Sequence, residues 1–384
     1  MNTQSILRDL IAFESVSANS NRALIDYCAN LLKEVGAEIT IIEDPTGQKA
    51  NLYATIGPKD IPGILLSGHT DVVPVTGQNW TVPPFEMTEK NGKLFGRGTT
   101  DMKGFVASAL SIALKAGSCE LKTPLHLALS YDEEIGCIGV RSMIDMLSTA
   151  PFRPLMCIVG EPTLMAVATG HKGKSAYQVT CHGQEAHSAL APTALNAIHL
   201  ACDMISFIRN LQSKIEQGSV QDDEYDVPYT TLHVGKINGG VALNIVPNHT
   251  EFRFEIRNLI SDNPDNLAQE IRDHADMLLQ PIHDQFPDAH IDIQLTNSYP
   301  SMDTSKEAEV VSFVKSLTGS NSTIKVAFGT EGGIFSAQLG IPTVICGPGS
   351  MAQGHKPDEF VSIDQLDKCD AMMGVLLDRL VTGI

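Results

Sequence analysis

The sequence predicts an α/β protein whose mostly parallel sheet, with helices on both faces, is interrupted by an inserted α+β domain. Three observations predict this fold. The chain has 384 residues, more than one hydrophobic core usually supports, so two domains are expected. Short apolar runs alternate with helical patterns up to about residue 170 and return near residue 341. Between them, residues 175–298 combine alternating strand patterns with two long helical patterns.

Four nearly continuous apolar runs have the composition of strands that are buried on both faces. They are GILLSGH at 63–69, LHLALSYDEE at 125–134, LMCIVGE at 155–161 and IPTVICGPG at 341–349. The first three runs end in polar residues, and a helical pattern, FVASALSIALKA, covers 105–116. Ligands of an open α/β sheet bind beyond the carboxyl ends of its strands, so these polar ends predict the position of a site.

The middle segment has the strand patterns SAYQVTCHG, YTTLHVGKI, TEFRFEIRN and HIDIQLTN, with helical patterns at 196–217 and 263–286. The order strand, helix, strand, strand, helix, strand indicates a split βαβ, or ferredoxin-like, sandwich. The predicted domains are therefore 1–174 together with 299–384, and the inserted 175–298.

Composition and charge limit the classes of partner. The formal net charge of -18 and the pI near 5.0 argue against nucleic acid and anionic membranes, because like charge raises the cost of approach. A small ligand, including a cationic one, fits better, although a role in solubility explains the acidity equally well. The N-terminus lacks a signal-peptide pattern, and the eight cysteines include no Cys-x-x-Cys pair. We therefore expect a cytoplasmic protein with reduced thiols.

The first candidate site residue is His69, which follows an apolar run and is succeeded two positions later by Asp71. Residues i and i+2 of an extended segment face the same side. A metal-bound histidine commonly has its other ring nitrogen held by a carboxylate, and Asp71 is placed to do this for His69. A local hydrogen bond without a metal explains the pair equally simply.

Carboxylates supply the next candidates. Asp101 lies in FGRGTTDMKGF before a helical pattern, where capping the helix is the simpler role. Glu133 and Glu134 end an apolar run, and neighbours in an extended segment point in opposite directions. One of them can then bind a metal while the other reaches an attacking water, although acidic pairs are also common on protein surfaces.

Two further residues complete the set. Glu161 closes LMCIVGEPT, where an unpaired charge would be costly, and His355 follows the last apolar run and a glycine-rich loop. Four of the five metal-ligand candidates lie beyond the ends of separate strands. Two histidines and three carboxylates form an oxygen- and nitrogen-rich set that suits two zinc or similar divalent ions.

The motifs SGHTDVVP, GRGTTDMKG, DEE, GEP and GHKPDEF, in this order, resemble those of the M20 family of metallopeptidases and deacylases. The resemblance covers nearly the whole chain. It implies two Zn²⁺ ions, with Co²⁺ as an exchangeable alternative, bridged by Asp101. It places His69 and Glu161 on one ion and Glu134 and His355 on the other. It also implies that Glu133 is the general base.

The same resemblance gives the inserted domain the role of a lid and dimerisation domain. GQEAHSA resembles the family segment whose histidine, here His187, reaches the active site of a partner subunit and stabilises the oxyanion. A homodimer follows from this resemblance. Asn244 and Arg257 match family positions that contact substrate, and an arginine suits a carboxylate. Without the family, they would be a turn asparagine and an exposed strand arginine.

Within the family, the blocks VPYTTLHVGKINGG, FGTEGGIFSAQLGIPTVICGPGS and AQGHKPDEF most resemble the acetylornithine deacetylase branch. This likeness implies hydrolysis of N-acetylornithine in arginine biosynthesis. We expect Glu331 to face the amino group of a cationic substrate, with capping of the helix that begins at Gly332 as the alternative. The alternative functions are a succinyl-diaminopimelate desuccinylase, an aminoacylase, a dipeptidase or carboxypeptidase, or an inactive metal-binding protein.

Overall fold

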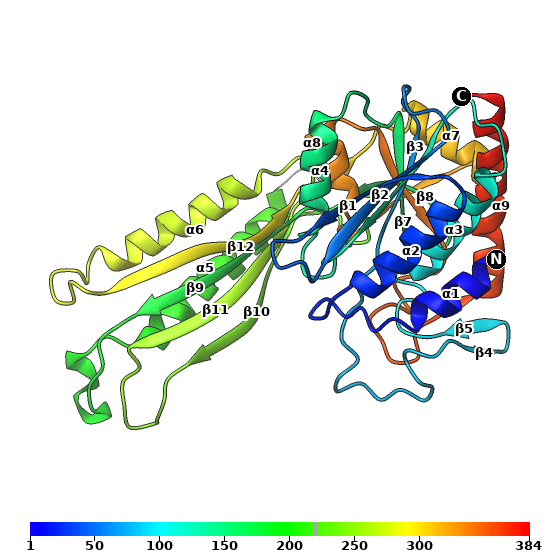
Figure 1. Cartoon of the computed structure of the whole chain (residues 1–384). Helices are drawn as coiled ribbons and strands as arrows, with labels where there is room; N and C mark the ends of the chain where they lie inside the picture. The colour runs from blue at the N-terminus through cyan, green and yellow to red at the C-terminus, as the bar shows by residue number, and fades with distance from the viewer. Residues whose placement is uncertain (219–220) are drawn as a thin grey trace. The chain divides into compact units, whose positions relative to one another are not determined.

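The computed structural model describes residues 1–218 and 221–384 and separates into two units (Figure 1). Unit 1 comprises Met1–His171 and Met302–Ile384, and unit 2 is the continuous segment Lys172–Ser301. These boundaries lie three residues from the predicted 174/175 and 298/299. An α/β fold with an interrupting α+β unit is thus confirmed.

Unit 1 is built on a nine-stranded sheet with the order β1-β2-β6-β3-β7-β15-β8-β13, with β14 paired to β8. Its strands are β1 (Glu38–Glu43), β2 (Ala50–Ile56), β3 (Ile64–His69), β6 (Leu125–Ser130), β7 (Met156–Pro162), β8 (Val167–His171), β13 (Met302–Asp303), β14 (Thr323–Val326) and β15 (Thr343–Gly347). The four central strands β6, β3, β7 and β15 run parallel, and every residue in them is buried. Their carboxyl ends therefore meet at one edge.

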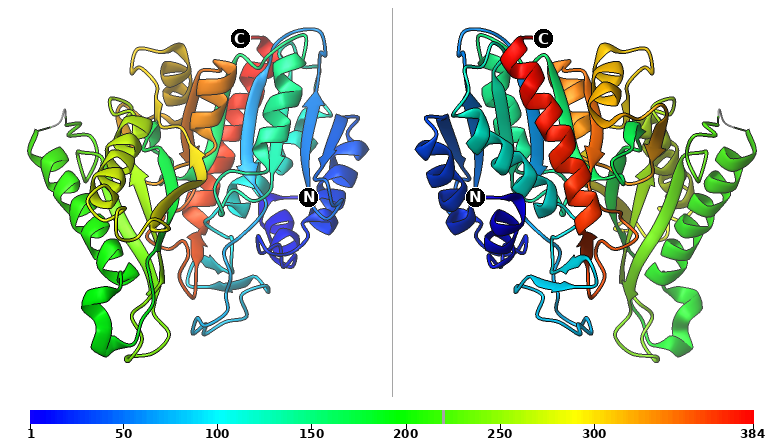
Figure 2. Two further views of the ribbon diagram at one scale, coloured as in Figure 1. Left: turned by 90° about the vertical axis from the view of Figure 1, so that its left-hand side faces the viewer. Right: turned by 90° about the vertical axis from the view of Figure 1, so that its right-hand side faces the viewer.

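Helices cover both faces of this sheet, as predicted (Figure 2). They are α1 (Thr3–Ile11), α2 (Arg22–Glu34), α3 (Lys103–Ala116), α4 (Val140–Thr149), α7 (Glu309–Thr318), α8 (Gly332–Leu339) and α9 (Ile363–Thr382). On one face α3 packs against α1, α2 and α9, and on the other α4 packs against α8. A small separate sheet has the order β16 (Phe360–Ser362), β5 (Lys93–Phe95), β4 (Thr88–Lys90). Helix α3 is buried along nearly its whole length, which explains its continuous apolar sequence.

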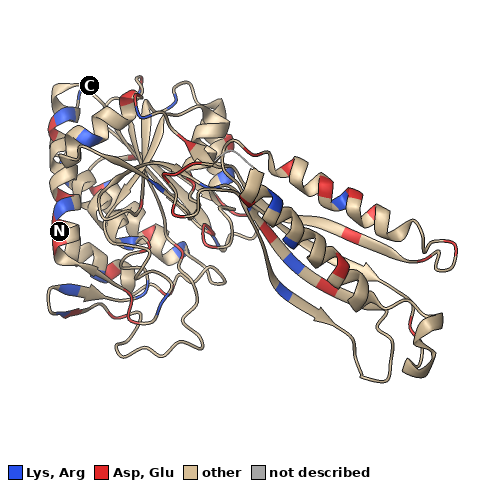
Figure 3. Ribbon diagram, turned by 180° about the vertical axis from the view of Figure 1, so that it is seen from behind, with Lys and Arg blue, Asp and Glu red and all other residues tan. Residues whose placement is uncertain are grey.

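Unit 2 has the predicted order of elements. They are β9 (Lys174–His182), the short 3₁₀ helix η1 (Ser188–Thr193), α5 (Ala197–Gly218), β10 (Thr231–Gly239), β11 (His249–Arg257), α6 (Pro264–Leu279) and β12 (His290–Tyr299). The strands form an antiparallel sheet in the order β10-β11-β9-β12, which is the ferredoxin-like arrangement. Buried residues alternate along β9 and β11 because α5 and α6 cover only one face. Acidic and basic residues are interspersed along the two helices (Figure 3).

Two predicted boundaries are wrong. The strand at 125–134 ends at Ser130, because the chain turns at Asp132, which has a positive φ of 55°. The helix at 263–286 ends at Leu279, since Pro281 lacks an N–H and its ring clashes with the preceding turn.

Two findings bear on the class of protein. No helix in the described ranges 1–218 and 221–384 combines the length and apolarity that crossing a membrane requires. All eight cysteines lie in these ranges and are free thiols.

Candidate metal centre

The five predicted ligands converge at the carboxyl edge of the central strands of unit 1. His69 is the last residue of β3, Glu161 lies at the end of β7, and Glu134 follows β6. Asp101 precedes α3, and His355 lies in the loop between β15 and β16. The topology thus brings together residues that are up to 286 positions apart, as the strand-end pattern predicts.

Asp101 lies between the two histidines. Its Oδ1 is 3.1 Å from His69 Nε2, and its Oδ2 is 3.0 Å from His355 Nε2. Each histidine has one further carboxylate: Glu161 Oε1 is 3.6 Å from His69 Nε2, and Glu134 Oε2 is 2.9 Å from His355 Nε2. The residues therefore form two sets of one histidine and one carboxylate that share Asp101.

Glu133 belongs to the same cluster. One carboxylate oxygen of Glu133, one of Glu161 and one ring nitrogen of His69 lie within 4.8 Å of one another. His69, Asp101 and Glu134 form a second such group. Glu133 is thus close enough to the metal-ligand candidates to act on a molecule that they hold.

Glu133 and Glu134 lie in the turn after β6 and not in the strand itself. The expectation that strand alternation points their side chains in opposite directions is therefore wrong, and the turn sets their directions instead. Asp71 accepts the backbone N–H groups of Glu133 at 3.1 Å and of Glu134 at 3.4 Å. Asp132, the residue before them, forms an ion pair of 2.6 Å with Lys49. Backbone hydrogen bonds and this ion pair therefore set the direction of both side chains.

Asp71 also orients His69, mainly through its backbone. Its carbonyl oxygen accepts His69 Nδ1–H at 2.9 Å, while its carboxylate is 3.6 Å from the same nitrogen. The expected carboxylate contact is therefore present but longer than the carbonyl contact, and the carboxylate also accepts the Ser17 hydroxyl at 2.7 Å. Because Nδ1 is occupied by this hydrogen bond, it is Nε2 of His69 that faces the carboxylates.

A buried network that the sequence did not indicate supports the other side of the cluster. Glu359 Oε1 accepts the backbone N–H groups of Gly98 at 3.1 Å, Thr100 at 2.9 Å and Asp101 at 3.1 Å. Its Oε2 forms a 2.6 Å ion pair with Arg97, and both side chains are 1 % exposed.

Arg97 extends this network to the second histidine. It donates to Gln78 Oε1 at 2.5 Å, and Gln78 donates to the backbone carbonyl of His355 at 2.9 Å. The network thus connects the loop of Asp101 with the loop of His355. Glu359 lies in the motif GHKPDEF and Arg97 in the motif GRGTTDMKG. Both motifs stand out in the sequence, but the sequence alone gave neither of these two residues a role.

The electrostatics of the cluster favour a bound cation. Burial, together with the neighbouring carboxylates, raises the pKa of Glu133 to about 8 and that of Glu134 to about 7. Burial also raises the pKa of Glu161 well above its usual range. Hydrogen bonds to Asp101 and Glu134 raise the pKa of His355 to about 10. Crowded carboxylates that resist ionisation are stabilised by positive charge.

The donor set fits two divalent ions of the zinc type. Two imidazoles and three carboxylates supply nitrogen and oxygen ligands, and one oxygen of Asp101 faces each histidine. Oε1 of Glu134 is buried and has no hydrogen-bond partner among the described residues. A buried carboxylate oxygen without a partner is costly, and a metal ion would remove that cost.

Glu331 is near this cluster but is not one of its ligands. It is 1 % exposed, and Oε2 accepts the Ser67 hydroxyl at 3.3 Å. It occupies the N-cap position of α8 without a side-chain cap, because Thr330 Oγ1 and His171 Nε2 accept the first N–H groups. The alternative role of Glu331 as a helix cap is thus not seen in its contacts, because its side chain accepts no N–H group of α8. Burial raises the pKa of Glu331 to about 7.

Two other predicted residues lie together in unit 2. His187 pairs with Ile245 through a backbone bridge, and the Ser188 N–H donates to the carbonyl of Asn244 at 2.9 Å. The side chains of His187 and Asn244 are exposed. His187 Nδ1 accepts the Ala189 N–H at 3.2 Å, so the ring proton lies on Nε2, where it can be donated to a ligand.

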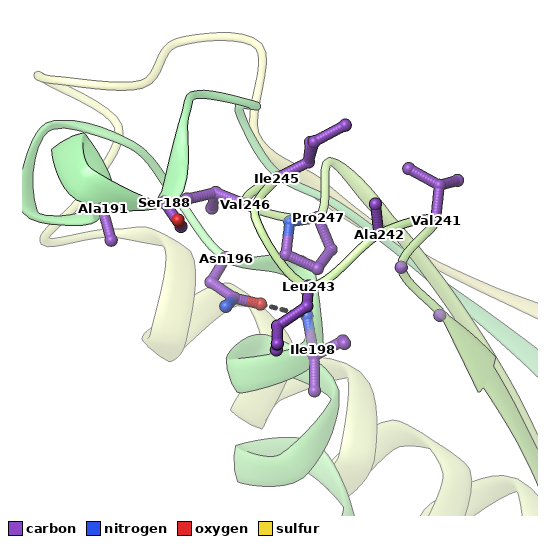
Figure 4. Close-up of a pocket in the computed structure, with 12 residues that line it drawn as sticks. Ser188, Ala191, Asn196, Ile198, Val241, Ala242, Leu243, Ile245, Val246 and Pro247 are labelled. Carbon is purple, nitrogen blue, oxygen red and sulfur yellow. Dashed lines mark hydrogen bonds between the residues drawn. The ribbon is translucent and has the colours of Figure 1, made fainter.

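These two segments border a pocket of about 550 Å³ in unit 2 (Figure 4). The apolar side chains Val241 and Leu243 at its rim are 87 % and 102 % exposed. Arg257 lies elsewhere, at the other end of β11, where it forms a 3.0 Å ion pair with Glu255 and donates to Tyr299 Oη at 2.8 Å. Unit 2 therefore does not bring Arg257 together with Asn244.

Comparisons with known proteins identify the family of the chain. The family model "Peptidase family M20/M25/M40" matches residues 65–379. The chain is 33% identical over 381 residues to an acetylornithine deacetylase of Proteus mirabilis (strain HI4320), covering 97% of this chain and 95% of that protein. Among solved structures, an M20 family metallo-carboxypeptidase from Sulfolobus solfataricus has a TM-score of 0.81 at 19% identity, with 99% of both chains covered. A Bacillus subtilis protein described as a dinuclear metal-binding peptidase from the M20 family has a TM-score of 0.69 at 15% identity, covering 100% of this chain and 98% of that one. The chain therefore belongs to peptidase family M20/M25/M40 and is a metal-dependent amide hydrolase.

Proposed function

We propose that the protein hydrolyses N2-acetyl-L-ornithine to L-ornithine and acetate, a step of arginine biosynthesis. The observation that carries this proposal is the likeness to an acetylornithine deacetylase, which spans 97% of this chain. The buried Glu331 adds support, since a cationic group of the substrate beside it would favour the ionised form of its carboxyl group.

The residues that would hold the metal are those of the two sets described above. His69 and Glu161 would bind one Zn²⁺, His355 and Glu134 the other, and Asp101 both, with Co²⁺ able to replace zinc. When bound, the ions supply Lewis acidity that polarises the amide carbonyl and makes water easier to deprotonate.

Glu133 would act as the general base. It takes the proton of the attacking water and returns it to the nitrogen of the departing amine, so that one amide and one water become acetate and ornithine. Burial raises the pKa of Glu133, and the positive charge of bound ions would lower it again, which favours the carboxylate form that takes up the proton. Asp71 would position Glu133 through its backbone N–H rather than exchange protons itself.

Residues of unit 2 would complete the site. We assign His187, with its proton on Nε2, to the developing oxyanion in the active site of a partner subunit. Arg257 would contact the α-carboxylate of the substrate, which would replace part of the contact between Arg257 and Glu255. Asn244, which lies beside His187 and apart from Arg257, would contact the substrate of the partner subunit together with His187. The exposed apolar residues 241 and 243 are consistent with a homodimer formed through unit 2.

The location proposed for this reaction is the cytoplasm, where the eight free thiols stay reduced. The substrate is then a small N-acylated amino acid, and neither nucleic acid nor a membrane takes part.

The experiment that tests the proposal is a comparison of substrates. Amine release is measured from N-acetylornithine, succinyl-diaminopimelate, acetylmethionine and a dipeptide, with zinc-loaded, cobalt-loaded and chelated protein. A clear preference for acetylornithine that is lost on chelation supports it. Preference for another amide would replace the substrate and keep the chemistry. Absence of metal-dependent turnover would favour an inactive metal-binding protein.

A further inference from the structure

Three histidines stand side by side across three neighbouring strands of unit 2. In the antiparallel register, His249 of β11 is the partner of His182 of β9, and His182 is also the partner of His290 of β12. Figure 1 shows the strands β11, β9 and β12 adjacent in this sheet. Directly opposed residues of an antiparallel pair have their side chains on the same face.

That face is the one that α5 and α6 leave uncovered. The residues next to the histidines, Cys181 and Thr250, are buried, and Ile291 packs against the core between the sheet and the helices. Side chains alternate along a strand, so the histidines point away from this core. Asp292 is two residues after His290 and therefore lies on the same outer face. The cluster is accessible to solvent, with the side chain of His182 34 % exposed and that of Asp292 54 % exposed.

The side chains are close enough to share one ion. The rings of His182 and His290 stack with centroids 4.0 Å apart, and His249 lies at 5.4 Å from His182. Oδ2 of Asp292 is 3.8 Å from His182 Nε2 and 3.6 Å from His290 Nε2. One ligand atom each of His182, His290 and Asp292 lies within 4.8 Å of the others.

The protonation of the cluster suits metal binding. His290 Nδ1–H donates to the carbonyl of Asp288 at 2.8 Å, which leaves the lone pair of Nε2 on the side of Asp292. Partial burial and the neighbouring His290 and His249 lower the pKa of His182, so its ring is neutral near pH 7. His182 therefore need not lose a proton before a metal ion binds to it.

We propose that His182, His290 and Asp292 form a further metal site, which takes one divalent transition-metal ion of the Zn²⁺, Ni²⁺ or Cu²⁺ class. Two imidazoles and one carboxylate are the ligands that these ions prefer, and His249 is placed to serve as a fourth. The remaining positions are open to water because the face is exposed.

Such an ion would bridge β9 and the edge strand β12 and so stabilise unit 2. The bridge is at the carboxyl end of β9, five residues before His187. Binding there depends on these side chains alone and not on which amide the protein hydrolyses.

The test is titration with Ni²⁺, in a calorimeter, of the full-length protein that holds two equivalents of Zn²⁺ and has been freed of excess metal, so that the site in unit 2 is empty at the start. The variants are His182→Asn and His290→Asn, and the matched control is His199→Asn, an exposed histidine of α5 in the same unit. Exchange at the zinc centre would occur equally in all four proteins. We expect one additional equivalent of Ni²⁺ in the unaltered protein and the control, with affinity at least about 10-fold weaker in both site variants.

A second measurement separates metal binding from altered folding. The melting temperature without added Ni²⁺ should be similar for the control and both site variants, and Ni²⁺ should raise it only where the site is intact. The proposal is overturned if no additional equivalent binds, or if His182→Asn and His290→Asn bind Ni²⁺ as tightly as the control.

Discussion

Replacing Glu359 with Gln should weaken metal binding although Glu359 is not a ligand. In the unaltered protein one oxygen of Glu359 accepts three backbone N–H groups, including that of Asp101, and the other pairs with Arg97. A glutamine has one acceptor oxygen and one donor nitrogen. Whichever way the amide is turned, its NH₂ group faces donors, either those of the backbone or that of Arg97.

The size of the effect follows from burial. Both partners of the pair are 1 % exposed, and breaking a buried ion pair by altering one partner costs about 3–5 kcal/mol of stability. Mutation of a residue that holds a metal ligand in place typically lowers metal affinity by about 10–100-fold. We expect a loss in that range, because Glu359 fixes the loop of Asp101 and, through Arg97 and Gln78, contacts the loop of His355.

The assay is competition for Zn²⁺ against a chelator of known affinity, with urea unfolding of the metal-free proteins measured beside it. Asp303→Asn is the matched control, since it breaks the ion pair with Lys325 elsewhere in unit 1 and should leave metal affinity unchanged. If Glu359→Gln binds both ions within twofold of the unaltered protein while its stability falls, Glu359 supports the fold alone and the reasoning is refuted.

Three further predictions concern other residues. Glu133→Ala should lower turnover about 10²–10⁴-fold or more while two metal ions remain bound, as activity and metal analysis would show; near-native turnover would exclude it as the base. Glu331→Gln should lower the kcat/KM ratio of acetylornithine to acetylmethionine about 10-fold, and an unchanged ratio would exclude charge recognition. Burial lowers the pKa of His126 to about 4 from 6.5, so the unfolded chain binds more protons between these values and stability falls as pH drops. From pH 7 to 5 the loss is about 2 kcal/mol, and urea unfolding should show it absent in His126→Phe; an equal loss in that variant would contradict the assignment.

The sequence pointed to the metal-ligand candidates as a set because most of them follow predicted strands, whose ends the topology then brings together. His69 and Glu161 terminate apolar runs, and parallel strands bring such ends to one edge whatever their separation in the chain. The strands of unit 2 could likewise be predicted, because one face of their sheet is buried and the other is not, which makes apolar and polar residues alternate along each strand.

Other parts of the site depend on contacts that have no local signal. The turn at Asp132, which redirects Glu133, follows from a positive φ and an ion pair with Lys49, a residue far away in the sequence. Glu359 and Arg97 are buried only because two distant loops meet around them. The row of three histidines in unit 2 depends on strand register, which a one-residue shift would destroy.

The insertion of unit 2 between β8 and β13 determines when the metal centre can form during synthesis. Residues 170 and 171 pair with 303 and 302, so the chain leaves the main sheet and re-enters it at neighbouring positions. Four of the five ligand candidates emerge from the ribosome before unit 2, and His355 emerges after it. Unit 2 is continuous and has its own core, so we expect it to fold while unit 1 still lacks β15 and α9. The complete set of ligands is then assembled only when the last strands and helix of the chain have joined the sheet.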